Sequence, residues 1–181
     1  MDLGPVSVMP HLLNIWPMVS QQLVSTPRTL LLFDYDGTLA PISRRPDTAR
    51  LSGKARRCLE GLAEKERFIV GVLSSRELNE LEGLVAVPGL VYVGNHGLEI
   101  RGLGMDFVHS GASGWVESLT EAVGPLEQEL GCIPELLVHN KRLTLSVHLG
   151  NEPDLYVNEV VHRVTSVMAH YVSVDEMKIT R

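Results

Sequence analysis

The segment from Leu30 to Ile42 most constrains what this chain can fold into. It opens with four apolar residues, Leu30 to Phe33, and then reaches Asp34 and, two places later, Asp36. A short continuous apolar run of this kind is typical of a strand buried on both faces of a parallel sheet. Such sheets bind ligands beyond the carboxyl ends of their strands. Because alternate residues share one face of a strand, we expect the two carboxylates to converge where the chain leaves the sheet.

Two neighbouring carboxylates at such a place indicate phosphoryl chemistry with a metal ion. Like charges repel unless a cation neutralises them, and Mg²⁺ typically takes one or two carboxylates together with substrate phosphate. One carboxylate can attack phosphorus covalently, while its neighbour handles the proton of the leaving alcohol. The alternative is an Asx turn with two solvated aspartates. The buried-type strand before the pair, and Gly37 and Thr38 after it, favour the chemical interpretation.

Composition and charge exclude some classes of protein. The 181 residues suffice for one domain or two small ones. A formal charge of −6 argues against nucleic acid or an anionic membrane as a partner, whereas a bound metal still permits an anionic substrate. We expect neither a membrane span nor a signal peptide. Cys58 and Cys132 match no metal spacing, which predicts a reduced, cytoplasmic compartment with both thiols in the core. The sequence does not determine the oligomeric state.

Alternating periodicities predict an α/β protein with a parallel three-layer sheet, followed by a small α+β module. The expected strands of the first part are 30–33, 68–73 and 90–93, with helices at 52–67 and 77–84 and a hairpin arm at 98–100. The expected elements of the second part are a helix at 115–130, strands at 135–139 and 142–149, a helix at 153–170 and a strand at 171–174. A lead-in helix at 12–24 is expected to pack on the core. The predicted domains are 1–28 (lead-in), 29–106 (core) and 107–181 (α+β module).

The stretch D-Y-D-G-T-L-A-P-I, which begins at Asp34, resembles the first motif of the haloacid-dehalogenase-like (HAD) phosphohydrolases, and most of all that of the trehalose-6-phosphate phosphatases. The resemblance implies a HAD-like core, here partial, with an inserted α+β cap that closes over the sugar. It implies that Asp34 is the nucleophile, that Asp36 is the general acid and base, and that both hold Mg²⁺. The expected reaction is hydrolysis of a sugar phosphate, most of all trehalose 6-phosphate, through an aspartyl-phosphate.

Two further motifs of the same family are expected to bind substrate. In V-L-S-S-R, Ser74 matches the family's phosphate-holding Ser/Thr and Arg76 matches its Arg, whereas Ser75 replaces a Gly. The alternative is that Ser74 or Ser75 caps the next helix. In G-N-H-G-L-E-I, His96 and Glu99 match the patch at the boundary between core and cap. The alternative there is a tight glycine turn with a satisfied histidine.

The cap-like segment from 138 to 148 carries the remaining expectations. Lys141 and His148 line up with the family's strand pair, and Lys141 is expected to contact the sugar phosphate. His139 stands where the family has a Glu, and Gly150 where it has an Arg, which leaves the identity of the sugar open. The alternative for Lys141 is a turn lysine in water.

Some parts of the family pattern have no match in this chain. The family's third-motif Lys and its acidic metal-binding loop find no counterpart after Leu149, because Asp175, Glu176 and Lys178 lack the right surroundings. We therefore expect a phosphatase chain that is incomplete at its C-terminus, with an open sheet edge or apolar face. The alternatives are a non-catalytic binding or regulatory homologue, and a HAD phosphatase for another sugar phosphate.

Overall fold

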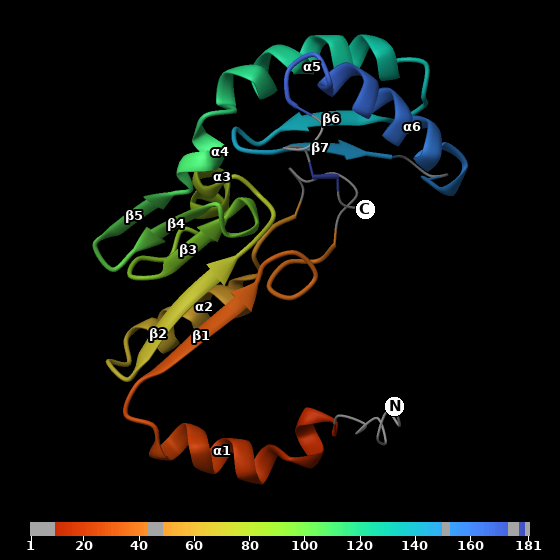
Figure 1. Cartoon of the computed structure of the whole chain (residues 1–181). Coiled ribbons are helices and arrows are strands. Elements are labelled where there is room, and N and C mark those ends of the chain that lie inside the picture. The colour runs from red at the N-terminus through yellow and green to blue at the C-terminus, as the bar shows by residue number, and fades with distance from the viewer. Residues whose placement is uncertain (1–9, 43–48, 150–152, 174–177, 180–181) are drawn as a thin grey trace, which may run out of the picture.

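The computed structural model describes residues 10–42, 49–149, 153–173 and 178–179 (Figure 1). A five-stranded sheet and a two-stranded sheet are each packed against helices. The elements of the first part are η1 (Leu12–Asn14), α1 (Trp16–Ser25), β1 (Thr29–Asp34), α2 (Gly53–Ala63), β2 (Phe68–Leu73), α3 (Leu78–Val85), β3 (Val91–Gly94), η3 (Asn95–Gly97), β4 (Glu99–Gly102) and β5 (Met105–Val108). Those of the second part are α4 (Ser110–Ser113), α5 (Val116–Leu130), β6 (Leu137–Asn140), β7 (Leu145–His148) and α6 (Pro153–Met168).

The larger sheet has the order β1-β2-β3-β4-β5. Strands β1, β2 and β3 are parallel, whereas β4 and β5 form an antiparallel hairpin beside β3. The predicted α/β class is confirmed, and the sheet is mixed rather than wholly parallel. The register pairs Asp34 with Leu73, and Leu73 with Val93, so the three parallel strands end at one edge.

Strand β1 lies at one border of this sheet, and one of its faces is open. Leu30 and Leu32 are 56% and 48% exposed, whereas Leu31 and Phe33 point to the side that is covered. The prediction that this strand is buried on both faces is therefore wrong, and the expectation of an open apolar face is confirmed. The covered side belongs to a core that includes residues of both α2 and α3, among them Leu59 and Leu81.

Helix α2 follows the predicted amphipathic pattern with one exception. The Ser52 side chain accepts a hydrogen bond from the Ala55 amide and caps the helix, as predicted. Leu59 is buried on the inner face, but Cys58 is exposed, and so is Cys132 after α5. The prediction of two core thiols is wrong, because a polar turn of the helix and a loop carry them. A cytoplasmic location stays a prediction.

The second part has its own apolar core between α5, α6 and the β6–β7 hairpin. Leu126 and Leu130 of α5 and Val160 of α6 are buried in it, together with Val138 of β6. Helix α6 ends at Met168, and residues 171–173 form a turn and bend instead of the predicted strand, while position 174 lies outside the described residues. The hairpin register pairs Val138 with Val147, which turns alternate residues toward the helices.

Helix α1 lies apart from the sheet (Figure 1). None of its residues is buried, and Trp16, Met18 and Val24 are exposed. The expectation that it packs on the core is therefore wrong. Pro17 is tolerated because it stands in the first helical turn, where a missing N–H costs nothing. Among the described residues, no helix is long and apolar enough to cross a membrane.

Candidate functional site

The loop after β1 is held in place by a buried tyrosine. Tyr35 is fully buried, and its hydroxyl donates to the Ala49 carbonyl at 3.1 Å. Its backbone amide donates to the carbonyl of Leu73, and the amides of Leu39 and Ala40 donate back to the Tyr35 carbonyl. Burial raises the pKa of the Tyr35 phenol. The tyrosine between the two aspartates thus fixes the backbone from which both carboxylates project.

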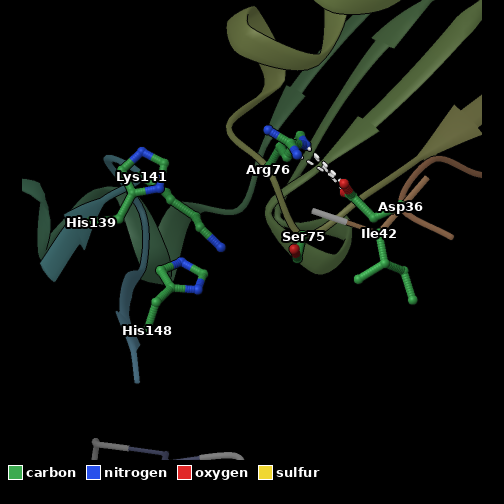
Figure 2. Close-up of a pocket in the computed structure, with 7 residues that line it drawn as sticks. All are labelled: Asp36, Ile42, Ser75, Arg76, His139, Lys141 and His148. Atoms are coloured by element: carbon green, nitrogen blue, oxygen red, sulfur yellow. Dashed lines mark hydrogen bonds and ion pairs between the residues drawn. The ribbon is translucent and has the colours of Figure 1, made fainter. Parts of the chain in front are cut away.

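Asp36 is bound by the loop that follows β2. The Ser74 hydroxyl donates to Asp36 Oδ2 at 3.0 Å. The Arg76 guanidinium donates to both carboxylate oxygens, with Nη2 at 2.8 Å from Oδ1 (Figure 2). Arg76 also pairs with Glu80. Burial acts to lower the pKa of Arg76, but the hydrogen bonds to Asp36 and Glu80 outweigh it, so that this pKa is raised.

The two predicted aspartates differ in their surroundings. Asp34 is exposed at the end of β1, and the described residues offer its carboxylate no hydrogen bond or ion pair. Asp36 is partly buried and accepts hydrogen bonds from both Ser74 and Arg76. Ser74 does not cap α3, whose first turn follows Glu77 without a side-chain cap. The helix-cap alternative for this serine is therefore wrong.

A cavity of about 140 Å³ lies between the larger sheet and the β6–β7 hairpin. Figure 2 shows its lining side chains on two opposed walls. One wall comes from the loops that follow β1 and β2, and the other comes from the β6–β7 hairpin. The lining residues are Asp36, Ile42, Ser75, Arg76, His139, Lys141 and His148. Segments more than 100 positions apart thus meet at the edge where the parallel strands end.

Lys141 faces this cavity from the turn between β6 and β7 (Figure 2). It is only 5% exposed, and the described part of the chain gives its ammonium group no hydrogen bond or salt bridge. Burial lowers the pKa of Lys141, while the charge of Glu80 opposes this effect. The alternative of a turn lysine in water is therefore wrong. A buried cation in such surroundings is suited to an anionic ligand.

Glu99 has a different position from the other predicted binding residues. It is 1% exposed, and its carboxylate accepts from the Leu78 amide, from Asn95 Nδ2 and from the Arg142 guanidinium. His96 is exposed, with φ of 58°. Neither residue lines the cavity, so the structure brings together Asp36, Arg76 and Lys141 but not His96 and Glu99.

Asn95 joins the core to the hairpin turn that carries Lys141. The Asn95 side chain is fully buried, and its Nδ2 donates to the Lys141 carbonyl at 2.9 Å. The Thr144 hydroxyl donates to Asn95 Oδ1 at 2.7 Å. The sequence motif places Asn95 between Gly94 and His96, but sequence reasoning did not single it out as functional. The φ of Asn95 is 47°, a positive value that asparagine tolerates better than most residues. The residue type is thus the one signal in the sequence that indicates this position.

Comparisons with known proteins agree with this architecture. The family model described as trehalose-phosphatase matches residues 32–179. The chain belongs to the trehalose-phosphatase family. It is 36% identical over 151 residues to the trehalose-phosphate phosphatase of Mycobacterium avium, an alignment that covers 83% of this chain and 37% of that protein. The chain thus spans little more than a third of the length of such relatives.

Two solved structures share the fold. The C-terminal domain of Candida albicans trehalose-6-phosphate phosphatase superposes with a TM-score of 0.70 at 23% identity, covering 88% of this chain and 55% of that one. The C-terminal domain of the Candida albicans trehalose synthase regulatory protein superposes with a TM-score of 0.61 at 14% identity, covering 91% and 58%. At these identities the likeness shows the fold alone. The family model and the sequence relative establish the family.

Proposed function

We propose that this chain carries the nucleophile, the acid/base and part of the cap of a phosphatase that hydrolyses a sugar phosphate, with trehalose 6-phosphate as the first candidate. The observation that carries the proposal is the cavity between Asp36 and Lys141, in a chain whose Asp34 carboxylate is exposed two residues before Asp36. Family membership supports a sugar phosphate as the substrate class. The Mycobacterium avium relative bears the name of a trehalose-phosphate phosphatase.

The proposed reaction has two phosphoryl-transfer steps. In the first, a carboxylate oxygen of Asp34 attacks phosphorus, the bond from phosphorus to the sugar oxygen breaks, and that oxygen takes a proton from Asp36. In the second, a water oxygen attacks phosphorus, the bond to Asp34 breaks, and Asp36 takes the proton of the water. Inorganic phosphate and the free sugar are released. Because no described residue binds the Asp34 carboxylate, its oxygens are available for attack.

Other residues would orient these groups. Ser74 and Arg76 both donate to Asp36, which fixes the position of its carboxylate in the loop after β1. Lys141 would attract the phosphate or its ester oxygens from the opposite wall. Ser75 lines the same cavity, so its hydroxyl is the better-placed serine to donate to a substrate, because Ser74 is already engaged with Asp36.

We also propose that the two carboxylates bind a magnesium ion when substrate is present. Mg²⁺ prefers oxygen ligands and commonly uses one or two carboxylates plus substrate phosphate. The carboxylate of Asp34 is exposed at the end of β1, and Asp36 follows two residues later in the loop. Among the described residues, no group of three or more His, Cys, Asp or Glu side chains forms a metal cluster. In this proposal Asp34 and Asp36 would supply the carboxylate ligands of the ion. A bound Mg²⁺ would neutralise charge between Asp34 and the phosphate.

Measuring phosphate release from trehalose 6-phosphate by the intact chain, with and without MgCl₂, tests this proposal. We expect Asp34→Asn and Asp36→Asn to lose activity by about 10³-fold or more, and EDTA to abolish turnover until Mg²⁺ is restored. Asp106→Asn, on the exposed β5, is the matched control. An acid-quenched single turnover should leave label from the phosphate on the wild type but not on Asp34→Asn. Equal turnover by Asp34→Asn would remove this residue from the mechanism.

A non-catalytic binding or regulatory role is the second candidate. The observation that favours it is that Asp34 does not line the cavity, while the carboxylate of Asp36 is already occupied by Arg76 and Ser74. This alternative predicts that trehalose 6-phosphate binds, by calorimetry, without any phosphate release. A panel of other sugar phosphates in the same two assays separates both candidates from a phosphatase for a different sugar.

A further inference from the structure

The Asn95 side chain is fully buried and is hydrogen-bonded at both ends of its amide group. Its Nδ2 donates to the Lys141 carbonyl at 2.9 Å and to Glu99 Oε1 at 2.5 Å, while its Oδ1 accepts from the Thr144 hydroxyl at 2.7 Å. Because carbonyl and carboxylate oxygens accept and do not donate, the amide nitrogen has to face them. Lys141 and Thr144 are the two ends of the turn between β6 and β7. One amide group thus holds this turn at two points.

The backbone around Asn95 holds the opposite wall of the cavity. The Asn95 amide donates to the Arg76 carbonyl at 2.7 Å, and the His96 amide donates to the Ser74 carbonyl at 3.2 Å. The side chains of Arg76 and Ser74 are the ones that bind Asp36. A single residue is therefore hydrogen-bonded to the loop that orients the acid/base candidate and to the hairpin turn on the other side of the cavity.

The hairpin turn carries a lysine that is costly to keep in place. Lys141 is only 5% exposed, and Figure 2 shows its side chain on the wall opposite Asp36. A desolvated ammonium group is unfavourable, so a turn without an anchor would let the side chain swing out into water. The Lys141 carbonyl accepts from both Asn95 Nδ2 and the Leu143 amide, which fixes the backbone from which the lysine projects.

We propose that Asn95 is a positioning residue that fixes Lys141 relative to Asp36 and so sets the width of the phosphate-ester site. This inference rests on the proposed function, in which the ester binds between the two walls. Asn95 does not line the cavity, so it acts through the residues that it holds and not by touching the substrate. A residue with a structural role alone would stabilise the fold without changing the behaviour of Lys141.

Asn95→Gly is the variant that tests this role most directly. It removes the amide group without straining the backbone, because glycine readily adopts the positive φ of this position. Calorimetry measures the affinity of the intact chain for inorganic phosphate with MgCl₂ present. We expect this affinity to fall about tenfold in Asn95→Gly, which corresponds to the loss of one charge-assisted contact with phosphate. In a Lys141→Met background the same substitution should change the affinity less than about twofold, because its effect passes through the lysine.

The matched control is Leu103→Gly. Leu103 has a positive φ of 55°, is exposed in the turn between β4 and β5, and does not line the cavity. This variant makes the same kind of backbone substitution away from the site. Its phosphate affinity should equal that of the wild type.

A second measurement needs no ligand, so it separates failure of this inference from failure of the proposed function. The chain has four lysines, so protein labelled with ¹³C at lysine Cε gives few NMR signals, and Lys141→Met assigns the signal of Lys141. Burial lowers the pKa of Lys141 in the wild type. We expect this pKa to return toward the usual lysine value in Asn95→Gly, because the ammonium group then reaches water. Leu103→Gly should leave it unchanged.

Thr144→Val tests the same contact from the hairpin and provides a second variant if Asn95→Gly does not fold. It removes the hydroxyl that donates to Asn95 Oδ1, whereas Thr144→Ser keeps a hydroxyl. We expect Thr144→Val to weaken phosphate binding about threefold and to raise the pKa of Lys141, and Thr144→Ser to behave like the wild type.

Two results would overturn the inference. One is an unchanged pKa of Lys141 in both Asn95→Gly and Thr144→Val. The other is an equal loss of phosphate affinity on Asn95→Gly with and without Lys141, because the residue would then act on the fold as a whole. A wild-type chain that binds no phosphate would contradict the proposed function, and the titration of Lys141 would still decide whether Asn95 positions it.

Discussion

Arg76 donates to both carboxylate oxygens of Asp36, with its Nε at 3.1 Å from Oδ2 and its Nη2 at 2.8 Å from Oδ1. The planar guanidinium binds the carboxylate through two nitrogen atoms. Its central carbon, Cζ, lies 5.5 Å from the centroid of the Tyr35 ring. One arginine therefore connects the loop after β2 to the loop after β1. The acid/base candidate is oriented by a partner 40 positions away.

Replacing this arginine by lysine tests the orientation. Arg76→Lys keeps the charge but loses the bidentate hydrogen bonding and the contact with the Tyr35 ring. We therefore expect kcat/KM for phosphate release to fall about tenfold or more. We also expect the free energy of unfolding to decrease by roughly 1–3 kcal/mol. Steady-state kinetics and urea denaturation measure these effects. Arg101→Lys is the control, because Arg101 forms its ion pairs with Glu82 and Asp106 away from the cavity. Wild-type kinetics in Arg76→Lys would show that the bidentate contact with Asp36 is not needed for phosphate release.

The Glu99 carboxylate provides a second test, which separates a structural from a substrate-binding role. It is buried and contacted by three donors, one of them Arg142 of the hairpin turn. We expect Glu99→Gln to lower the free energy of unfolding by about 2 kcal/mol, because an amide donor then faces other donors. Glu129→Gln, on the surface of α5, should cost less than about 0.5 kcal/mol. Unchanged stability with a raised KM would instead make Glu99 a substrate ligand.

Acidification should destabilise the fold through His148. Burial and the charges of Lys141, His139 and Arg76 lower its pKa below the usual value of about 6.5. The unfolded chain therefore binds this proton at a higher pH than the folded protein does, and stability falls as the pH drops below about 6.5. We expect the decrease in Tm between pH 7.5 and 5.5 to be smaller in His148→Gln than in the wild type.

The control for this pH effect is His162→Gln, because His162 is exposed on α6 and does not line the cavity. Its Tm should follow pH as the wild type does. Burial also lowers the pKa of Lys141, but Lys141 is present in the wild type and in both histidine variants, so its contribution is common to the three proteins. Identical slopes in His148→Gln and the wild type would show that this imidazole titrates normally.

Several features of the fold could be predicted from local sequence alone. Strand β2 runs from Phe68 to Leu73 as predicted, because apolar and β-branched residues there are flanked by polar ones. Ser52 begins helix α2 because its hydroxyl accepts from the Ala55 amide. The proximity of Asp36 and Arg76 could also be predicted, because each residue lies in the loop that follows one of two parallel strands.

Other features depend on tertiary contacts between distant segments, and the local sequence does not reveal these contacts. The apolar run of β1 indicates what a strand prefers but not whether a neighbour covers it, and Leu32 remains half exposed. The motif around Glu99 predicts a ligand, but the direction of β4 turns this side chain into the protein, toward Arg142. The meeting of His139 and His148 at the cavity depends on the hairpin register, which is set by side chains on its other face.

The open face of β1 leads to the last prediction, which compares two leucines. Leu32 is 48% exposed, and Leu81 of α3 is fully buried on the covered side of the same sheet. Leu81→Ala should lower the free energy of unfolding by roughly 2–5 kcal/mol, because it leaves a cavity. Leu32→Ala should cost less than about 1 kcal/mol, since half of its apolar surface already faces water. Urea denaturation of both variants measures the difference. If Leu32→Ala costs as much as Leu81→Ala, this face is covered in solution, and a dependence of the wild-type transition on protein concentration would then identify a second copy as the cover.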